Sequence, residues 1–184
     1  GCVNLLKGAM LCADSVTTVS PTYAKQLHYS FYAHGLENIV DMVSYKMEGV
    51  LNGLDVEGFD PAIDPQIYAN YTPDDTAGKT VCKAELQRQL DLNQDVNAPM
   101  MAIVSRLVSH KGVDLICQVL DGMMDTGLQL VVLGKGDAGY ENFFRMAQER
   151  YPGRVSAQIT YSDKLSRQIY SGADLFLMPS KSEP

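Results

Sequence analysis

The feature that most constrains the fold is a short apolar run, Met100 to Val104, that leads through a loop into an amphipathic segment. Five consecutive apolar residues bounded by Pro99 and Ser105 predict a strand that is buried on both faces. After the loop, apolar residues recur at helical spacing, at Val113, Ile116, Cys117, Leu120 and Met124. A buried strand followed by an amphipathic helix is the unit from which parallel sheets are built.

The same alternation continues to the end of the sequence. Further strands are expected at residues 128–133, 155–160 and 174–178, with helices between them, and Ser162 is expected to cap the helix over 164–171. A helix over 80–90 comes before the first strand, with Val81, Leu86 and Leu90 expected to face inward. The pattern predicts an α/β fold, a Rossmann-like parallel sheet with helices on both faces.

The first part of the chain is less regular. A helix is expected over residues 4–12 and a strand over 15–19, and Ser20 and Pro21 form a helix start, with Ser20 as the N-cap. Residues 36–47 fit a helix only loosely. Residues 55–73 are rich in Asp, Pro, Gly and Tyr, which indicates an irregular connection.

Composition excludes some classes of function. The 184 residues carry a formal net charge of −7, which argues against non-specific nucleic-acid binding and a polybasic membrane surface. No apolar run approaches the length of a membrane span, and the first residues lack the pattern of a signal peptide. The four cysteines share no metal-ligand spacing and are expected to be reduced core thiols of a cytosolic protein: Cys2, Cys12, Cys82 and Cys117.

Unusual residues follow the carboxyl end of each expected strand, where parallel sheets bind ligands. Arg106 and Lys111 lie beside a helix start and suit an anion such as phosphate, although two solvated surface cations would look the same. Tyr161 offers a flat face for a base or sugar, or is an ordinary half-exposed tyrosine. Lys181 and Glu183 follow the last strand.

Residues 134–139 form a Gly-x-Gly-x-x-Gly sequence between a strand and a helix. The dinucleotide fingerprint also needs an acidic residue about 20 positions further on, at the end of the next strand. That strand ends near Tyr161, and Asp163 comes late. A nicotinamide-dependent dehydrogenase is therefore disfavoured, whereas a phosphate-approaching turn and a plain tight turn both remain open.

Four stretches, residues 14–23, 50–55, 104–112 and 171–180, resemble bacterial glycogen synthase and plant starch synthase, in order and over nearly the whole chain. The resemblance implies a GT-B glycosyltransferase, with two Rossmann-like domains that face each other across a cleft. It implies glucose transfer from ADP-glucose to the non-reducing end of an α-1,4-glucan, with retention and with neither cofactor nor metal. No nucleic-acid or membrane partner is expected.

The resemblance also implies roles for single residues. Arg106 and Lys111 match the cations that hold the donor diphosphate and stabilise the ADP leaving group, and Glu183 matches the first of a pair of glutamates near the sugar. These three are the expected catalytic residues. Four residues are expected to bind the nucleotide sugar. Asn52 lies in the turn between the domains, Gly134 and Gly136 form a glycine turn beside the nucleotide, and Tyr161 matches the aromatic that stacks on adenine.

The match is incomplete in two respects. Lys181 and Ser182 stand where the family usually has Arg-Phe, which puts the packing of that loop in doubt. The family's amino-terminal glycine loop, its acceptor-side histidine and its second glutamate have no counterpart in these residues. By this alignment, residues 1–50 are the carboxyl-terminal part of the first domain and residues 51–184 the front half of the second, nucleotide-sugar-binding domain.

Several expectations follow for the chain as it stands. Alone it should not transfer glucose, and the last strand, left with a bare apolar face, should promote self-association or disorder near Glu183. Two alternatives stay open: a UDP-sugar-dependent transferase of the same architecture, like sucrose or trehalose-phosphate synthase, and a non-catalytic nucleotide-binding fragment. The expected compartment is the bacterial cytoplasm or the plastid stroma.

Overall fold

The computed structural model describes residues 3–183, which divide into two compact units. Unit 1 holds residues up to Leu54 together with Glu183, and unit 2 holds Asp55–Ser182. The division falls near the expected boundary at residue 50, although the domain assignment itself stays a prediction. Within residues 3–183, no helix is both long and apolar enough to cross a membrane.

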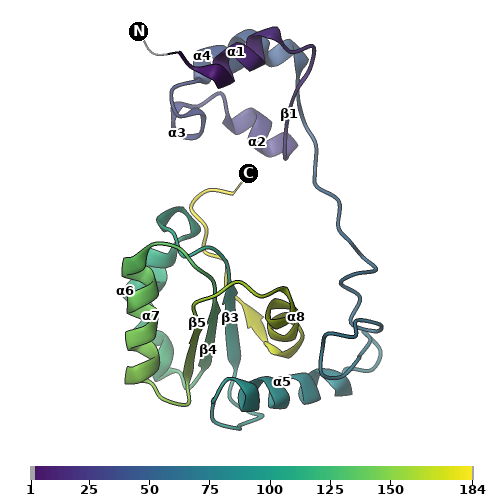
Figure 1. Cartoon of the computed structure of the whole chain (residues 1–184), viewed down its shortest axis with the longest axis vertical. Helices are drawn as coiled ribbons and strands as arrows, with labels where there is room; N and C mark the ends of the chain where they lie inside the picture. The colour runs from purple at the N-terminus through teal and green to yellow at the C-terminus, as the bar shows by residue number, and fades with distance from the viewer. Residues whose placement is uncertain (1–2, 184) are drawn as a thin grey trace. The chain divides into compact units, whose positions relative to one another are not determined.

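Unit 2 is a parallel α/β structure (Figure 1). Its strands lie in the order β5-β4-β3-β6, and every neighbouring pair is parallel. This confirms the predicted fold class. The elements, in chain order, are α5 (Ala77–Gln89), β3 (Met100–Val104), the 3₁₀ turn η2 (Ser109–Lys111), α6 (Val113–Asp125), β4 (Gln129–Leu133), α7 (Ala138–Arg150), β5 (Val155–Gln158), α8 (Asp163–Gly172) and β6 (Leu175–Phe176).

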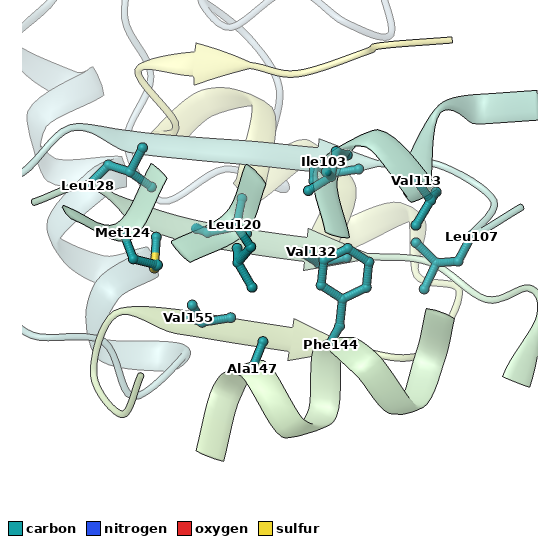
Figure 2. Packing of buried hydrophobic residues seen from close by; sticks show 12 residues of the cluster. Ile103, Leu107, Val113, Leu120, Met124, Leu128, Val132, Phe144, Ala147 and Val155 are labelled. Carbon is teal, nitrogen blue, oxygen red and sulfur yellow. The ribbon is translucent and has the colours of Figure 1, made fainter. Parts of the chain in front are cut away.

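Helices cover both faces of this sheet because its strand side chains alternate between two cores. Ile103 and Val132 point into one core, which they share with Leu120 of α6 and Phe144 of α7 (Figure 2). The next residues along the same strands point into the other core, which Leu86 of α5 and Ile169 of α8 complete. Figure 1 shows α6 and α7 together on one side of the sheet and α5 and α8 on the other.

The register brings the carboxyl ends of the strands to one edge. Val104 pairs with Leu133, and Leu133 pairs with Gln158, so β3, β4 and β5 end level with one another. The chain moves outward from β3 to β5 and then returns across the sheet to place β6 on the other side of β3. Such a reversal opens a crevice at the carboxyl ends of the strands, where α/β sheets bind ligands.

Polar contacts fix the return to β6. Asp174, just before β6, accepts hydrogen bonds from the backbone N–H of Met100 at 2.8 Å and from Lys83 Nζ at 2.6 Å. Lys83 is buried and also donates to the Val96 carbonyl at 3.0 Å. The predicted cap of α8 is confirmed, since Ser162 Oγ accepts from the Leu165 N–H at 3.2 Å.

Unit 1 is mainly helical around a short parallel pair of strands, β1 (Val16–Thr18) and β2 (Met47–Gly49). The predicted helix start is confirmed, because Ser20 Oγ accepts from the Tyr23 N–H at 2.9 Å. The remaining elements are α1 (Leu5–Cys12), α2 (Pro21–Gln26), α3 (Ser30–Ala33), α4 (Glu37–Val43) and the 3₁₀ turn η1 (Ser44–Lys46).

Some details of the sequence prediction are wrong. Val81 does not face inward: its exposed fraction is 47%, and the adjacent Cys82 is buried instead. Cys12 is exposed rather than a core thiol, and Cys117 is only partly buried, while Cys2 lies outside the described residues. The ambiguous stretch 36–47 divides into a helix, a 3₁₀ turn and the start of a strand.

The last strand is shorter than expected, and its apolar residues remain accessible. Only Leu175 and Phe176 belong to β6, and both side chains are about half exposed, as is Met178 beyond them. Tyr170 of α8 packs against Phe176, with 5.4 Å between the ring centroids. The expected self-association stays a prediction.

Candidate functional site

Unit 2 has a cavity of about 420 Å³ at the carboxyl ends of β3, β4 and β5. Arg106, Gly134 and Tyr161, which follow these three strands, all line it. The cavity therefore brings together a cation, a glycine turn and an aromatic ring that lie far apart in the sequence. Its volume is in the range of small-molecule sites.

The loop after β3 carries both expected cations. Arg106 is exposed, and its Nη2 lies 3.3 Å from Nε2 of His110, four residues further along the chain. Lys111 ends η2 and directly precedes Gly112, whose φ of 73° lets the chain enter α6. Lys111 is partly buried and, unlike Arg106, does not line the cavity.

The glycine turn after β4 packs directly against this loop. A Cβ on Gly134 would lie 1.8 Å from the Ser105 carbonyl oxygen, and one on Gly136 would lie 2.1 Å from the Leu107 carbonyl oxygen. Backbone hydrogen bonds connect the two loops, from the Leu107 N–H to the Lys135 carbonyl at 2.9 Å among others. Both glycines are therefore needed for close loop packing.

The carboxylate of Glu141 holds the turn from the other side. Its Oε1 accepts a hydrogen bond from the Gly136 N–H at 3.0 Å, and its Oε2 pairs with Arg145 at 3.2 Å. The bond from Gly136 lowers the pKa of Glu141 more than any other contact. Because the Gly136 N–H already has this acceptor, the geometry favours a tight packing turn over one that presents Gly136 to a phosphate.

Tyr161 lies between β5 and the cap of α8. Its exposed fraction is 88%, although its backbone stands next to the fixed helix start at Ser162. A ring that is nearly fully exposed at the rim of a cavity keeps its face available for stacking.

The segment after β6 rests on the cation loop. The Lys181 N–H donates to the His110 carbonyl at 2.9 Å, and Lys181 Nζ pairs with Asp114 Oδ2 at 2.5 Å. This bond lowers the pKa of the Asp114 carboxyl. The Pro179 carbonyl lies against Gly112, where a Cβ would stand 2.0 Å from the oxygen. Lys181, which replaces the usual Arg, thus has a definite partner.

The other two expected site residues belong to unit 1. Asn52 and Glu183 are both exposed there. Of the seven expected site residues, unit 2 therefore contains five, and its cavity is lined by Arg106, Gly134 and Tyr161.

Sequence reasoning missed several residues of the cavity. Asp163, Ser166 and Tyr170 line it from α8. Their spacing places them on one face of the helix, which could have indicated that they face the same cavity. Phe59 lines it from the irregular segment before α5, where no periodic pattern pointed to it. Across the described residues 3–183, no group of three or more His, Cys, Asp or Glu side chains is placed to hold a metal ion.

A parallel sheet with two helical layers and a cavity at the carboxyl ends of its strands defines unit 2 as a Rossmann-like domain. Comparison with known proteins agrees. Residues 85–184 match the family model described as glycosyl transferases group 1, and residues 1–42 match the starch synthase catalytic domain. The chain therefore belongs to the glycosyl transferases group 1 family.

Individual relatives are similar over the whole chain. A glycogen synthase of Streptococcus mutans is 44% identical over 183 residues, and one of Thermotoga petrophila is 45% identical over 182 residues. These matches cover 100% and 99% of this chain but only 38% and 37% of the relatives. The chain thus spans well under half the length of the curated relatives it matches.

A solved structure agrees with the fold. The catalytic domain of starch synthase IV from Arabidopsis thaliana, bound to ADP and acarbose, matches with a TM-score of 0.92 and 34% identity. That match covers 99% of this chain and 38% of the other. A glycosyltransferase from Rickettsia africae matches at 21% identity with a TM-score of 0.60, a likeness of fold alone. The α/β fold of GT-B type is confirmed.

The close loop packing predicts that Gly134→Ala destabilises unit 2. The added Cβ cannot avoid the Ser105 carbonyl without moving the backbone, so the free energy of unfolding should fall by about 1–3 kcal/mol. Gly139→Ala is the matched control, because a Cβ there meets nothing within 4 Å; it should be neutral or stabilising by at most about 1 kcal/mol. Urea unfolding of both variants tests this, and equal stabilities would contradict the packing role.

Proposed function

We propose that the protein containing this chain is a glycogen or starch synthase. It transfers glucose from ADP-glucose to the non-reducing end of an α-1,4-glucan, with retention of anomeric configuration. The observation that carries the proposal is the cavity that joins Arg106 to the exposed ring of Tyr161, in a chain similar throughout to glycogen synthases. The similar starch synthase IV structure, which is bound to ADP and acarbose, supports the same donor and a glucan-like acceptor.

The cations carry the chemical step of this proposal. The bond between the anomeric carbon and the diphosphate oxygen breaks, that oxygen takes the electron pair, and negative charge grows on the leaving ADP. A hydroxyl oxygen at the glucan end forms the new bond to the anomeric carbon, and its proton passes to the leaving diphosphate. Arg106 and Lys111 stabilise the negative charge on the leaving ADP. One well-placed group of this kind lowers the activation barrier by about 3 kcal/mol. The proposal gives this work to side chains and includes no metal or other cofactor.

The remaining residues bind and orient the donor. Tyr161 stacks on the adenine, the turn at Gly134 and Gly136 shapes the wall beside the nucleotide, and Asn52 and Glu183 contact the sugar end. The partners are thus ADP-glucose and an α-1,4-glucan, without nucleic acid or membrane. The compartment, bacterial cytoplasm or plastid stroma, also stays a prediction.

Competition between nucleotides tests the donor. In the complete encoded protein, ADP should bind more tightly than UDP, and labelled glucose should pass from ADP-glucose to glycogen. Isothermal titration measures the two affinities, and incorporation into glycogen measures transfer. Preference for UDP would favour the sugar-nucleotide alternative, and binding without any transfer would favour a non-catalytic nucleotide-binding role.

Changing either cation should mainly reduce turnover. In the complete encoded protein, Arg106→Ala or Lys111→Ala should lower kcat by roughly 100-fold or more, because each removes stabilisation of the leaving group. The melting temperature should hardly change, since both residues lie in the loop between β3 and α6. Steady-state kinetics with ADP-glucose and glycogen measure the effect; near-normal turnover in either variant would refute that residue's role.

The ring of Tyr161 should matter more than its hydroxyl. Tyr161→Ala should weaken ADP binding by roughly 1–3 kcal/mol, the range for stacking of bases on aromatic side chains. Tyr161→Phe should bind ADP almost normally, because it keeps the ring. Titration calorimetry compares the two variants, and equal losses would assign the role to the hydroxyl instead.

A further inference from the structure

The irregular segment before α5 is fixed to α8 by one side chain, Arg167. Its Nη1 lies 3.1 Å from Asp64 Oδ2 and also donates to the Gly58 carbonyl. Its Nε lies 3.0 Å from Asp163 Oδ2, and its guanidinium carbon stands 4.2 Å from the centre of the Phe59 ring. One guanidinium thus joins two carboxylates, a carbonyl and an aromatic face.

These contacts are well shielded from water. The side chain of Arg167 is 13% exposed and that of Asp64 only 6%. Each charge is therefore stabilised mainly by its partner and little by water. Removing the guanidinium would leave Asp64 buried without its cation, which is costly. The planar fork of arginine suits several simultaneous hydrogen bonds, whereas lysine could not replace all of them. Arg167 therefore holds Phe59 in one place although the segment around it has no regular structure.

Phe59 lines two hollows of unit 2. Phe59 and Tyr170 line both the 420 Å³ cavity and a smaller hollow of about 80 Å³, and Arg167 and Asp64 line only the smaller one. The ring thus contacts the fixed guanidinium and also borders the larger cavity. Its exposed fraction of 53% leaves apolar surface available to a ligand.

The position of α8 indicates which part of a nucleotide Phe59 would meet. Tyr161 directly precedes the cap of this helix, and Phe59 is held to the same helix through Arg167. Arg106, by contrast, follows β3 on a different strand of the sheet. Lys135, which follows β4, also lines the cavity. The cavity therefore has an aromatic end at α8 and a cationic side at the ends of β3 and β4, which suits a base at the first and phosphates at the second.

We infer that Phe59 forms an apolar wall for the base of the bound nucleotide, and that Arg167 is the positioning residue that holds it there. The inference rests on the proposed function, since it assigns residues to the base end of that same site. It predicts that both residues affect binding of a nucleoside diphosphate but not of its diphosphate part alone.

Calorimetric titration of the complete encoded protein tests this with three probes: ADP, UDP and inorganic pyrophosphate. Phe59→Ala should weaken binding of the preferred nucleotide by about ten-fold, as expected for loss of an aromatic contact to a base. Phe59→Leu, which leaves the Arg167 contacts to Asp64 and Asp163 in place, should weaken it less. Pyrophosphate affinity should stay within about two-fold in both variants, because the phosphates are held elsewhere.

Two further variants test whether Arg167 positions Phe59. Arg167→Met should weaken nucleotide binding several-fold with pyrophosphate affinity unchanged, and it should raise KM for the nucleotide sugar more than it lowers kcat. The double variant Asp64→Asn with Arg167→Met avoids the buried unpaired carboxylate and should show the same split even if the single variant folds poorly.

Arg150→Met is the matched control. Arg150 also stacks on a ring, 4.9 Å from the centre of Tyr151, and pairs with Asp121 at 2.5 Å, but it lines neither hollow. It should leave all three affinities unchanged.

The outcomes separate the inference from the proposed function. Normal nucleotide affinity in Phe59→Ala, or an equal loss for pyrophosphate, would overturn the inference while the donor site stood. A wild-type preference for UDP would overturn the proposed donor, and the Phe59 variants would then be judged on UDP. A wild-type protein that binds neither nucleotide would overturn both.

Discussion

The candidate site depends on backbone pairing that continues beyond the ends of the strands. The Ser105 N–H donates to the Leu133 carbonyl at 3.1 Å, and the Leu107 N–H and carbonyl bond to Lys135 and Asp137 at 2.9 Å each. At Gly134 the two loops also approach so closely that a Cβ would lie 1.8 Å from the Ser105 carbonyl oxygen, so only a residue without Cβ fits at that contact. Gly134 meets that need, and the loop with Arg106 is fixed as a consequence.

The parts of the fold that local sequence patterns specify could be predicted, whereas the parts that depend on contacts between distant residues could not. The bounds of β3 were predicted to the residue, because a continuous apolar run specifies a strand buried on both faces. The error at Val81 has a physical cause: α5 buries Lys83 and Gln87, whose partners are Asp174 and Gln129, so its inward face is partly polar. Hydrophobic periodicity cannot reveal a buried face whose polar groups have partners elsewhere in the chain.

The cavity shows the same limit more strongly. Residues such as Arg106 and Tyr161 were predictable because parallel strands bring their carboxyl ends to one edge. Phe59 was not, since its place depends on an ion pair between Asp64 and Arg167, which are 103 residues apart. Nothing local in residues 55–73 encodes that contact. An irregular segment obtains its position from specific tertiary partners, and these appear only once the sheet is assembled.

Charge and exposure explain how an acidic chain can offer a site for a diphosphate. The net charge is −7, yet Arg106 and Lys135 both line the cavity. Exposed charges are screened beyond about 8–10 Å at physiological salt, so the nearest groups decide what the cavity attracts. Those groups are side chains on a backbone fixed by glycine packing and by the cap of α8. Binding and stability can therefore vary separately at Arg106 and Tyr161, whereas at Gly134 they cannot.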